Sequence, residues 1–348
     1  MRWLGNLALV VVAAAVPCIA MEAWLRLQAA PPDTPELFVR QASAVEWLGR
    51  PNASGLHSGV PVAFNELGVR DRSRAPKAPP GTARILALGD SVTFGMGVRF
   101  EHTYPAQTEQ LLNAALARPV EVLNFGIPGY NTLHQLAQLR SLGLAFKPDV
   151  VLVGFLYNDV ELSSRQQEAL AAAPAAPSAS AAFPRNVLSA INEGVRTLKQ
   201  NSLFFAWLTP RLGLALRPLG FKNLGQVGEF RDQYAEGSPN WRRMREALLE
   251  MKALGAEHDF QLAVMVIPAM ARFTEAGYPL RDYHRAVTAF CREHGIPVLD
   301  LLPAFWGRDG SSFWISPTDG HPDAEAHRIM AEALAPFLEP LVRKPIAH

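Results

Sequence analysis

Short apolar runs alternate with amphipathic stretches in two parts of the chain, before residue 160 and after residue 240. The apolar runs are typical of buried parallel strands and predict strands at 84–88, 120–125, 149–155, 261–267 and 297–301. The amphipathic stretches predict helices at 104–117, 133–144, 241–254 and 283–294, and another that begins near Asp323. Strands that alternate with helices predict an α/β fold, a three-layer α/β/α domain with a parallel, flavodoxin-like sheet.

The N-terminal segment, residues 1–27, contains an uncharged stretch from Trp3 to Met21. As a helix this stretch would span roughly 28 Å at ~1.5 Å per residue, close to the ~30 Å hydrocarbon core of a bilayer. The helical pattern continues through Glu22 and Arg26, which favours an uncleaved transmembrane signal anchor over a cleaved signal peptide. Under both interpretations the rest of the chain is exported. A third interpretation is that the helix is buried in the core of a cytosolic protein.

Two regions interrupt the α/β pattern. Residues 28–60 are rich in Pro, Ala and polar residues and predict a linker before a domain at 61–340. An insertion at about 163–240 divides this domain, and it begins with Ala/Pro/Ser low-complexity sequence at 169–184. Two helical patterns follow, at 187–200 and 203–216. The second is apolar enough to lie on a membrane surface, to close over a pocket or to pack in the core.

Composition excludes several classes of function. The 33 Lys and Arg residues nearly balance the 32 Asp and Glu residues, and a net charge of +1 gives no bulk attraction to nucleic acid. Cys18 and Cys291, the two cysteines, cannot form a disulfide framework or a Cys-based zinc cluster. No phosphate-binding loop and no clustered ligand set occurs, so the sequence predicts neither a metal nor a nucleotide cofactor.

The segment Gly89-Asp90-Ser91-Val92-Thr93-Phe94-Gly95 directly follows the first predicted strand. Open α/β sheets place their ligand sites at the carboxyl ends of the strands. A serine on a tight turn there exposes its hydroxyl, and backbone N–H groups point into the same space, as a serine nucleophile requires. Asp90 and Ser91 are also good helix N-caps, a role that can coexist with catalysis.

This segment resembles the first block of the SGNH/GDSL hydrolase superfamily, and three further blocks follow in the expected order. Gly129 stands in the place of the second block's backbone-donor glycine. The third block, Gly-x-Asn-Asp, is matched by Asn158 and Asp159, although Leu156 replaces its glycine. The last, Asp-x-x-His, is shortened here to Asp319-Gly320-His321. The resemblance implies a serine-dependent ester hydrolase that requires no cofactor.

The similarity to this superfamily covers roughly 64–159 and 255–337. Residues 64–71 and 95–98 resemble a bacterial, membrane-anchored branch whose members carry an N-terminal anchor. That branch implies a single-pass protein of the inner membrane with a periplasmic catalytic domain, and secretion after signal-peptide cleavage is the alternative. Protein partners are not predicted.

The roles of the site residues follow from the needs of the chemistry. A serine hydroxyl is a poor nucleophile, so Ser91 needs an imidazole to accept its proton and a carboxylate to orient that imidazole. We expect His321 to be the base and Asp319 its partner. The charge on the attacked carbonyl oxygen needs an oxyanion hole, for which we expect the backbone N–H groups of Ser91 and Gly129 and the side chain of Asn158.

The choice of base lies between two of the nine histidines. Only His321 and His327 lie in or just after the predicted loop ahead of the last helix, where carboxylates are close by. His321 is preceded by Asp319 and followed by Pro322, which stiffens the loop. His327 falls inside the helix, points elsewhere and is expected to hydrogen-bond back to the sheet edge, so we predict His321 as the base.

The substrate is predicted from the expected rim of the pocket, which comprises Tyr130, Asn131, Tyr157 and Asn158. Tyrosines stack on sugar faces and amides bond sugar hydroxyls, so we predict a short acyl ester, an O-acetyl group on an envelope carbohydrate. Three alternatives remain open: a polysaccharide O-acetyltransferase with the same triad, a non-catalytic carbohydrate-binding or assembly protein, and a lipase-like enzyme with a lid at 203–208.

Overall fold

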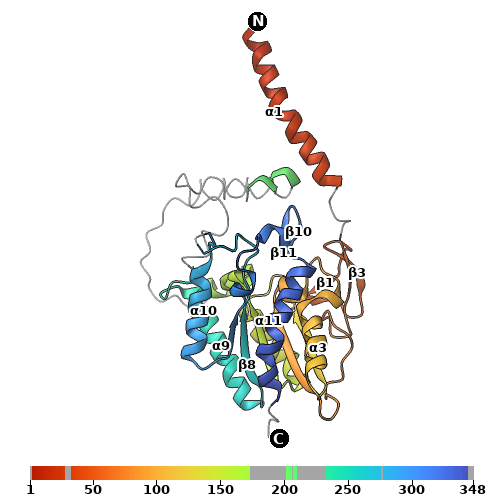
Figure 1. Ribbon diagram of the computed structural model, residues 1–348, viewed down its shortest axis with the longest axis vertical. Helices are drawn as coiled ribbons and strands as arrows, with labels where there is room; N and C mark the ends of the chain where they lie inside the picture. Colours follow the sequence, from red (N-terminus) through yellow and green to blue (C-terminus); the bar gives the residue numbers. More distant parts are fainter. Residues whose placement is uncertain are drawn as a thin grey trace. The chain divides into compact units, whose positions relative to one another are not determined.

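A computed structural model describes residues 2–27, 33–172, 201–205, 207–209, 233–275 and 277–343. At its centre lies a five-stranded parallel sheet (Figure 1). Its strands are β5 (Ala83–Gly89), β6 (Val120–Gly126), β7 (Val150–Phe155), β8 (Gln261–Val266) and β9 (Val298–Asp300). The order β6-β5-β7-β8-β9 is the flavodoxin-like order, so the α/β fold with a central parallel sheet is confirmed.

Strand composition explains why the sheet is buried. Every residue of β5 and β7 is buried, and parallel pairing runs along the whole of β5, from Ala83 opposite Val120 to Gly89 opposite Gly126. A strand that is covered on both faces has no polar side to show, which is why these strands read as continuous apolar runs in the sequence.

Helices cover both faces of the sheet, as the predicted three-layer architecture requires. On one face α3 (Tyr104–Ala115) packs beside α11 (Ala324–Arg343). On the other, α4 (Thr132–Ser141) packs beside α9 (Pro239–Glu257), while α10 (Arg281–Glu293) lies against β8 and β9. The one-turn helix α2 (Ser91–Phe94) connects the end of β5 to this framework.

Short elements connect this framework. A hairpin of β10 (Trp314–Ser316) and β11 (Asp319–Pro322) precedes α11. The single-turn 3-10 helices are η1 (Phe100–His102), η2 (Gly143–Phe146), η3 (Tyr157–Val160), η5 (Leu302–Phe305) and η6 (Gly310–Phe313).

The structure differs from the sequence prediction before β5. The stretch predicted as a linker, 28–60, contributes to two antiparallel hairpins from Asp33 onward. Their strands are β1 (Phe38–Arg40), β2 (Trp47–Gly49), β3 (Ser54–His57) and β4 (Val60–Ala63). Their apolar side chains form a cluster with Phe94 of α2 that contains Leu37, Val62 and Phe64. These strands are too short and too mixed in polarity to show a strand pattern in the sequence. They are stabilised by packing against residues from other parts of the chain.

The N-terminal segment and the insertion form a separate compact unit, comprising residues 1–31 and 165–228. The helix α1 (Arg2–Leu27) contains Glu22, whose carboxylate accepts hydrogen bonds from the Ser202 hydroxyl and from Phe204 N, at 2.8 and 2.7 Å. Among the described residues, no helix is both long and apolar enough to cross a membrane. The side chains of residues 2–12, part of the predicted span, lie outside the described set.

Most of the predicted insertion also lies outside the described residues. This applies to the low-complexity sequence after residue 172, to the helix predicted at 187–200 and to 210–216 of the helix predicted after it. The described parts are α5 (Ser164–Ala172) and short helical pieces at 203–205 and 207–209.

Candidate active site

The Ser91 turn is held by local hydrogen bonds and by close packing. The Asp90 carboxylate caps α2 by accepting from Val92 N at 2.9 Å, and Gly95 ends the helix in the left-handed region at φ +83°. Glycines at the strand ends leave room for α2. A methyl group on Gly89 would come within 1.9 Å of Thr93 Oγ1, and one on Gly126 within 2.2 Å of Phe94 N.

The structure brings Ser91, His321 and Asp319 together. His321 Nε2 lies 2.9 Å from Ser91 Oγ, and His321 Nδ1 lies 2.5 Å from Asp319 Oδ1. Asp319 and His321 are carried by the β10–β11 hairpin, where the sequence predicted a loop. Because side chains two residues apart on a strand point to the same face, β11 presents its acid and its imidazole on one side.

The pKa shifts of His321 and Asp319 favour proton transfer from Ser91 to the imidazole. Burial lowers the pKa of His321, but the hydrogen bond and charge of Asp319 and the charge of Asp90 outweigh burial and raise it above the ordinary value. Burial raises the pKa of Asp319, and its hydrogen bonds and ion pair with His321 reverse this and lower it overall. Asp319 is therefore ionised at neutral pH and stabilises the imidazolium that forms when Ser91 gives up its proton.

The two other predicted donors follow the strands on either side of β5. Gly129 follows β6, at φ +81° in a turn closed by a hydrogen bond from Tyr130 N to Ile127 O. Asn158 follows β7, in η3, and its amide Oδ1 is buried without a hydrogen-bond partner in the described structure. Since β6 and β7 flank β5, both residues are delivered to the edge of the sheet that carries Ser91.

Asp159, next to Asn158, braces this edge of the sheet. It is fully buried; one carboxylate oxygen accepts from Thr132 Oγ1 and Gln135 Nε2, both at 2.9 Å, and the other accepts from Leu156 N at 2.7 Å. Burial, together with the charge of Asp90, raises the pKa of Asp159 well above its usual range. Its carboxyl thus ties the start of α4 to η3 and fixes the backbone on which Asn158 stands.

Two of the four residues predicted at the rim of the pocket are not there, and that prediction is wrong. Tyr130 is 1% exposed, and its hydroxyl donates to Trp47 O. Asn131 is 2% exposed, caps α4 by accepting from His134 N and donates to Glu161 O. Both polar groups bond the backbone, as loop Tyr and Asn side chains often do. Tyr157 and Asn158 keep intermediate exposure.

His327 lies on α11 and does not contact Ser91 by any hydrogen bond in the structure. The ring is fully buried, and its Nδ1 accepts from Tyr104 N at 3.0 Å, at the start of α3. It therefore binds a neighbouring helix, where a bond to the sheet edge was expected. Burial, with the charges of Arg70 and His321, lowers the pKa of His327 to about 3, so the ring is neutral at physiological pH.

Two residues that the sequence patterns did not predict contact the loops of the site. The Arg70 guanidinium donates to carbonyls of the segment that follows α2, and the Trp47 indole donates to Pro128 O beside Gly129. Arg70 stands within the stretch 64–71 that resembles the membrane-anchored branch, a signal that could have found it. Trp47 lies in the predicted linker and had no such signal.

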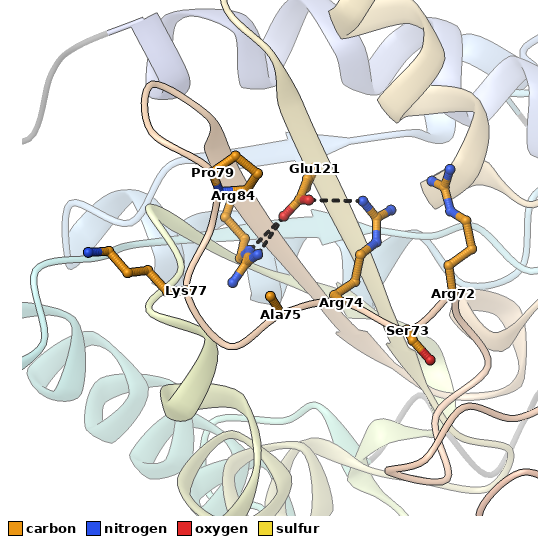
Figure 2. A pocket seen from close by; sticks show the side chains of 8 residues that line it. All are labelled: Arg72, Ser73, Arg74, Ala75, Lys77, Pro79, Arg84 and Glu121. Atoms are coloured by element: carbon orange, nitrogen blue, oxygen red, sulfur yellow. Dashed lines mark hydrogen bonds and ion pairs between the residues drawn. The ribbon is translucent and has the colours of Figure 1, made fainter.

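A cavity at the opposite end of β5 is separate from this site (Figure 2). It is lined by Arg72, Ser73, Arg74, Ala75, Lys77, Pro79, Arg84 and Glu121. Arg84 is the second residue of β5 and Gly89 the last, a separation of roughly 16 Å at ~3.3 Å per residue. Glu121 forms ion pairs with both Arg74 and Arg84, at 3.3 and 2.6 Å, so these guanidinium groups stabilise the fold.

A serine, an imidazole and a carboxylate in hydrogen-bonded order, at the carboxyl end of a parallel sheet, form the arrangement of serine hydrolases. The chain belongs to the GDSL-like lipase/acylhydrolase family, whose model matches residues 87–329, well over half of the chain. It is accordingly an enzyme that hydrolyses ester bonds.

The chain is similar to several solved structures at low sequence identity. An acetylxylan esterase from Geobacillus stearothermophilus, Axe2, is 16% identical; the match covers 74% of this chain and 94% of that one, with a TM-score of 0.43. LAE5, an α/β hydrolase enzyme from the metagenome of Lake Arreo, is 15% identical, with coverage of 74% and 96% and a TM-score of 0.43. No curated protein matches the chain.

Proposed function

We propose that this protein hydrolyses a short acyl ester through Ser91 as nucleophile, His321 as general base and Asp319 as the carboxylate that orients it. One observation carries the proposal: the continuous hydrogen-bonded chain from Ser91 Oγ through both ring nitrogens of His321 to Asp319, at 2.9 and 2.5 Å. With Asp319 holding the proton on Nδ1, the lone pair of Nε2 faces the serine hydroxyl.

The reaction proceeds in two halves. Ser91 Oγ bonds to the ester carbonyl carbon while its proton passes to His321 Nε2, and the resulting tetrahedral intermediate carries an oxyanion. Collapse breaks the bond to the alcohol, which takes the proton from His321 and leaves an acyl group on Ser91. Water, deprotonated by His321, then releases the carboxylic acid and restores the serine.

The oxyanion is stabilised by donors that are in place before the reaction. We assign this role to the backbone N–H groups of Ser91 and Gly129 and to the amide of Asn158, each worth about 3 kcal/mol of the barrier. Gly129 suits the role because its positive φ turns the peptide in a way that a residue with a Cβ adopts only with strain. Asn158 is kept in place by the hydrogen bonds of the neighbouring Asp159 carboxyl to α4 and to Leu156 N.

The proposed acyl group is short, acetyl on an envelope carbohydrate. Leu156 stands where the superfamily has glycine. We expect its larger side chain to narrow the pocket beside Asn158, which would favour a small acyl group over a long chain. Of the four rim residues expected from the sequence, Tyr157 and Asn158 keep intermediate exposure, and we propose that they contact the sugar. The carbohydrate proposal thus rests on these two residues and on the proposed location.

The proposed location is the cell envelope, with α1 as an N-terminal membrane anchor and the hydrolase domain outside the cytoplasm. The uncharged stretch from Trp3 to Met21 supports this, as does the resemblance of residues 64–71 to the anchored branch. The full chain is expected in the membrane fraction, and a chain without residues 1–27 in the soluble fraction. A full chain that stays soluble would contradict the anchor.

Turnover measured on a series of nitrophenyl esters and on acetylated sugars tests the function and its substrate class. Ser91→Ala is expected to lose turnover by several orders of magnitude, and the wild type is expected to prefer acetyl over chains longer than eight carbons. Product analysis with and without an acceptor sugar separates hydrolysis from transfer. Full activity in Ser91→Ala would overturn the mechanism, while turnover that climbs with chain length would overturn the carbohydrate proposal.

A further inference from the structure

The residues before the family-matched region carry side chains that reach the loops of the site. This segment, residues 33–74, comprises the β1–β4 hairpins and the chain that leads from them toward β5. We call it the N-terminal brace. Two of its side chains, Arg70 and Trp47, contact the turn that carries Ser91 and the loop that carries Gly129.

Arg70 is 1% exposed, and in the described part of the chain no carboxylate forms an ion pair with its guanidinium. Instead it donates to three backbone carbonyls after the nucleophile: Phe94 O at 2.9 Å, Gly95 O at 2.6 Å and Val98 O at 2.7 Å. It also lies over the Phe94 ring, 4.9 Å from the centroid. A planar guanidinium fixes the positions of several acceptors at once, which a single ammonium does not.

The clamped turn is coupled directly to Ser91. The carbonyl of Ser91 accepts hydrogen bonds from Gly95 N and Met96 N, at 3.1 and 3.0 Å. Gly95 and Gly97 both have positive φ, so the turn contains residues with high intrinsic freedom. By holding the carbonyls of this turn, Arg70 restrains the backbone from which the serine hydroxyl and the Ser91 N–H both project.

Trp47, which also belongs to the N-terminal brace, holds the loop that carries Gly129. Its indole Nε1 donates to Pro128 O at 3.0 Å, and its backbone carbonyl accepts from the Tyr130 hydroxyl. A methyl group on Gly129 would meet the Trp47 ring at 3.2 Å, so the indole lies against the glycine itself. Three consecutive residues, Pro128 to Tyr130, are thus fixed by one tryptophan.

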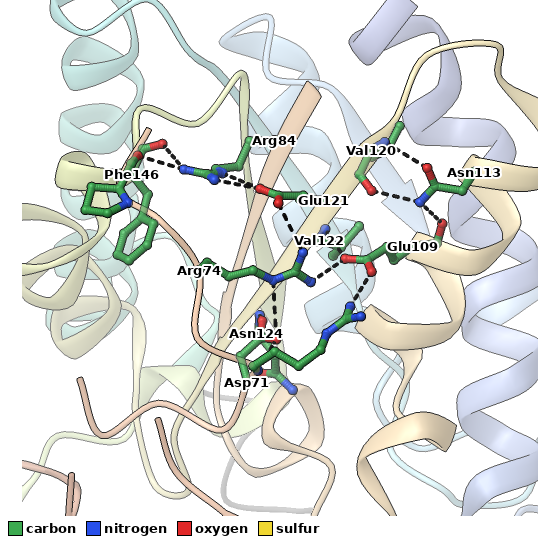
Figure 3. A network of polar contacts seen from close by, with 12 residues as sticks. Asp71, Arg74, Arg84, Glu109, Asn113, Val120, Glu121, Val122, Asn124 and Phe146 are labelled. Carbon is green, nitrogen blue, oxygen red and sulfur yellow. Dashed lines mark hydrogen bonds and ion pairs between the residues drawn. The ribbon is translucent and has the colours of Figure 1, made fainter. Parts of the chain in front are cut away.

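The brace is itself fastened to the sheet by a polar network (Figure 3). Directly after Arg70, the Asp71 carboxylate accepts from Asn124 N of β6 at 2.7 Å. Arg74 pairs with Glu109 of α3 and with Glu121 of β6, at 2.6 and 3.3 Å. These contacts anchor the chain that carries Arg70 to α3 and to β6, the strand that leads to the Gly129 loop.

We propose that Arg70 and Trp47 are positioning residues for catalysis: Arg70 holds the Ser91 turn, Trp47 holds the Gly129 loop, and the brace is a working part of the active site. The inference rests on the proposed function of Ser91 and Gly129. Attack requires the hydroxyl and the oxyanion donors in fixed relative positions, and a displacement of about 1 Å can cost on the order of 100-fold in rate.

Arg70→Lys tests the first contact, with Arg84→Lys as the matched control. Arg84 is likewise a fully buried arginine, which donates to Phe146 O and Pro76 O and pairs with Glu121, but it is the second residue of β5, at the end away from Ser91. Both variants are expected to lower the thermal midpoint. Per folded molecule, Arg70→Lys is expected to lower kcat about 10- to 100-fold with little change in KM, and Arg84→Lys to leave both near wild type.

Trp47→Phe tests the second contact and does not depend on the folding of the Arg70 variant. Phenylalanine keeps an aromatic ring and loses the hydrogen bond to Pro128 O. We expect kcat for a nitrophenyl ester and the rate of inactivation by a phosphonate probe to fall together, about 10-fold, because both reactions need the oxyanion donors. Trp306→Phe makes the same change at an exposed residue whose ring contacts Tyr278 and Arg281, and is expected to leave both rates unchanged.

The outcomes separate the brace from the proposed function. Loss of turnover in Ser91→Ala, together with wild-type kcat in folded Arg70→Lys and Trp47→Phe, would overturn the brace and leave the function standing. Retained turnover in Ser91→Ala would overturn the function. Equal loss of kcat in Arg84→Lys or Trp306→Phe would also contradict the brace, because the effect would then follow from general destabilisation.

Discussion

The carboxylate of Asp319 contacts the imidazole of His321 at 2.5 Å from a position two residues earlier on the same strand, β11. Alternate side chains of a strand share one face, so the backbone itself sets this contact. The short Asp-x-His spacing, which departs from the superfamily's Asp-x-x-His, is therefore compatible with an acid–base pair because the hairpin is extended at this point. A loop with the same spacing would not fix the two groups.

This contact determines the expected pH dependence. The pKa of His321 is raised above its ordinary value of about 6.5 because the interactions with Asp319 outweigh burial. The base accepts a proton only when it is neutral, so kcat/KM is expected to rise with pH along an acid limb centred above about 6.5. A pH–rate profile with an uncharged nitrophenyl ester measures this limb.

Asp319→Asn supplies the control for the pH profile. The substitution keeps the size of the side chain and removes its charge, so the acid limb is expected to move to lower pH. The plateau should fall by about 10³- to 10⁴-fold, as the imidazole loses the partner that fixes its tautomer. A limb at the same pH in both proteins would show that Asp319 does not act on the base.

Asn158→Ala is expected to lower kcat by about 10²- to 10³-fold with KM nearly unchanged, because the amide is proposed to bind the oxyanion that exists only during attack. Asn113→Ala is a matched control: Asn113 bonds Val120 at the start of β6, away from the site. Its loss should affect stability and not kcat. Equal effects of the two substitutions would contradict the assignment of Asn158.

The two candidate bases are expected to respond differently to substitution. His321→Ala should lower ester turnover by several orders of magnitude in a protein of near-normal stability, since its side chain is about one-third exposed. His327→Asn should keep turnover per folded molecule, because an amide oxygen can replace Nδ1 as the acceptor for Tyr104 N. Similar losses of turnover in two well-folded variants would overturn the choice of His321.

His327 is expected to make stability depend on pH. Its pKa is about 3 in the folded protein and about 6.5 in the unfolded chain, so below pH 6.5 only the unfolded chain takes up the proton. The stabilisation present above pH 6.5 is lost as pH falls toward 3. Between pH 6.5 and 5, the free energy of unfolding should decrease by about 1.6 kcal/mol more in wild type than in His327→Asn. Parallel denaturant titrations measure this difference; identical slopes would contradict it.

The parts of the fold that could be predicted are those encoded by local patterns. β5, β7 and β8 are continuous apolar runs because both faces of the sheet are covered, and Ser91 is marked by the small residues around it. The hairpins β1–β4 could not be predicted, because Leu37, Val62 and Phe64 are buried in a cluster that also contains Phe94 of α2, a residue outside the hairpins. Their stability is a property of the assembled domain.

The same reason explains the wrong residues at the rim. Tyr130 and Asn131 stand beside Gly129 in sequence, and a polar residue in a site loop suggests contact with substrate. In the structure their polar groups bond Trp47 O and Glu161 O, two carbonyls that the sequence gives no reason to place there. Their position beside Gly129 in the sequence suggested a role at the site. Only the folded structure shows that their polar groups form hydrogen bonds within the protein.

Labelling with a serine-reactive fluorophosphonate, followed by intact-protein and peptide mass spectrometry, tests the central claim most directly. The phosphorus bonds to an activated serine and mimics the tetrahedral intermediate, so labelling needs the nucleophile, the base and the oxyanion donors together. We expect one adduct per wild-type chain, on the peptide that contains Ser91, with matching loss of ester turnover. No adduct is expected in Ser91→Ala, and far slower labelling in His321→Ala. An unlabelled wild-type enzyme, or an adduct that persists in Ser91→Ala, would contradict the account.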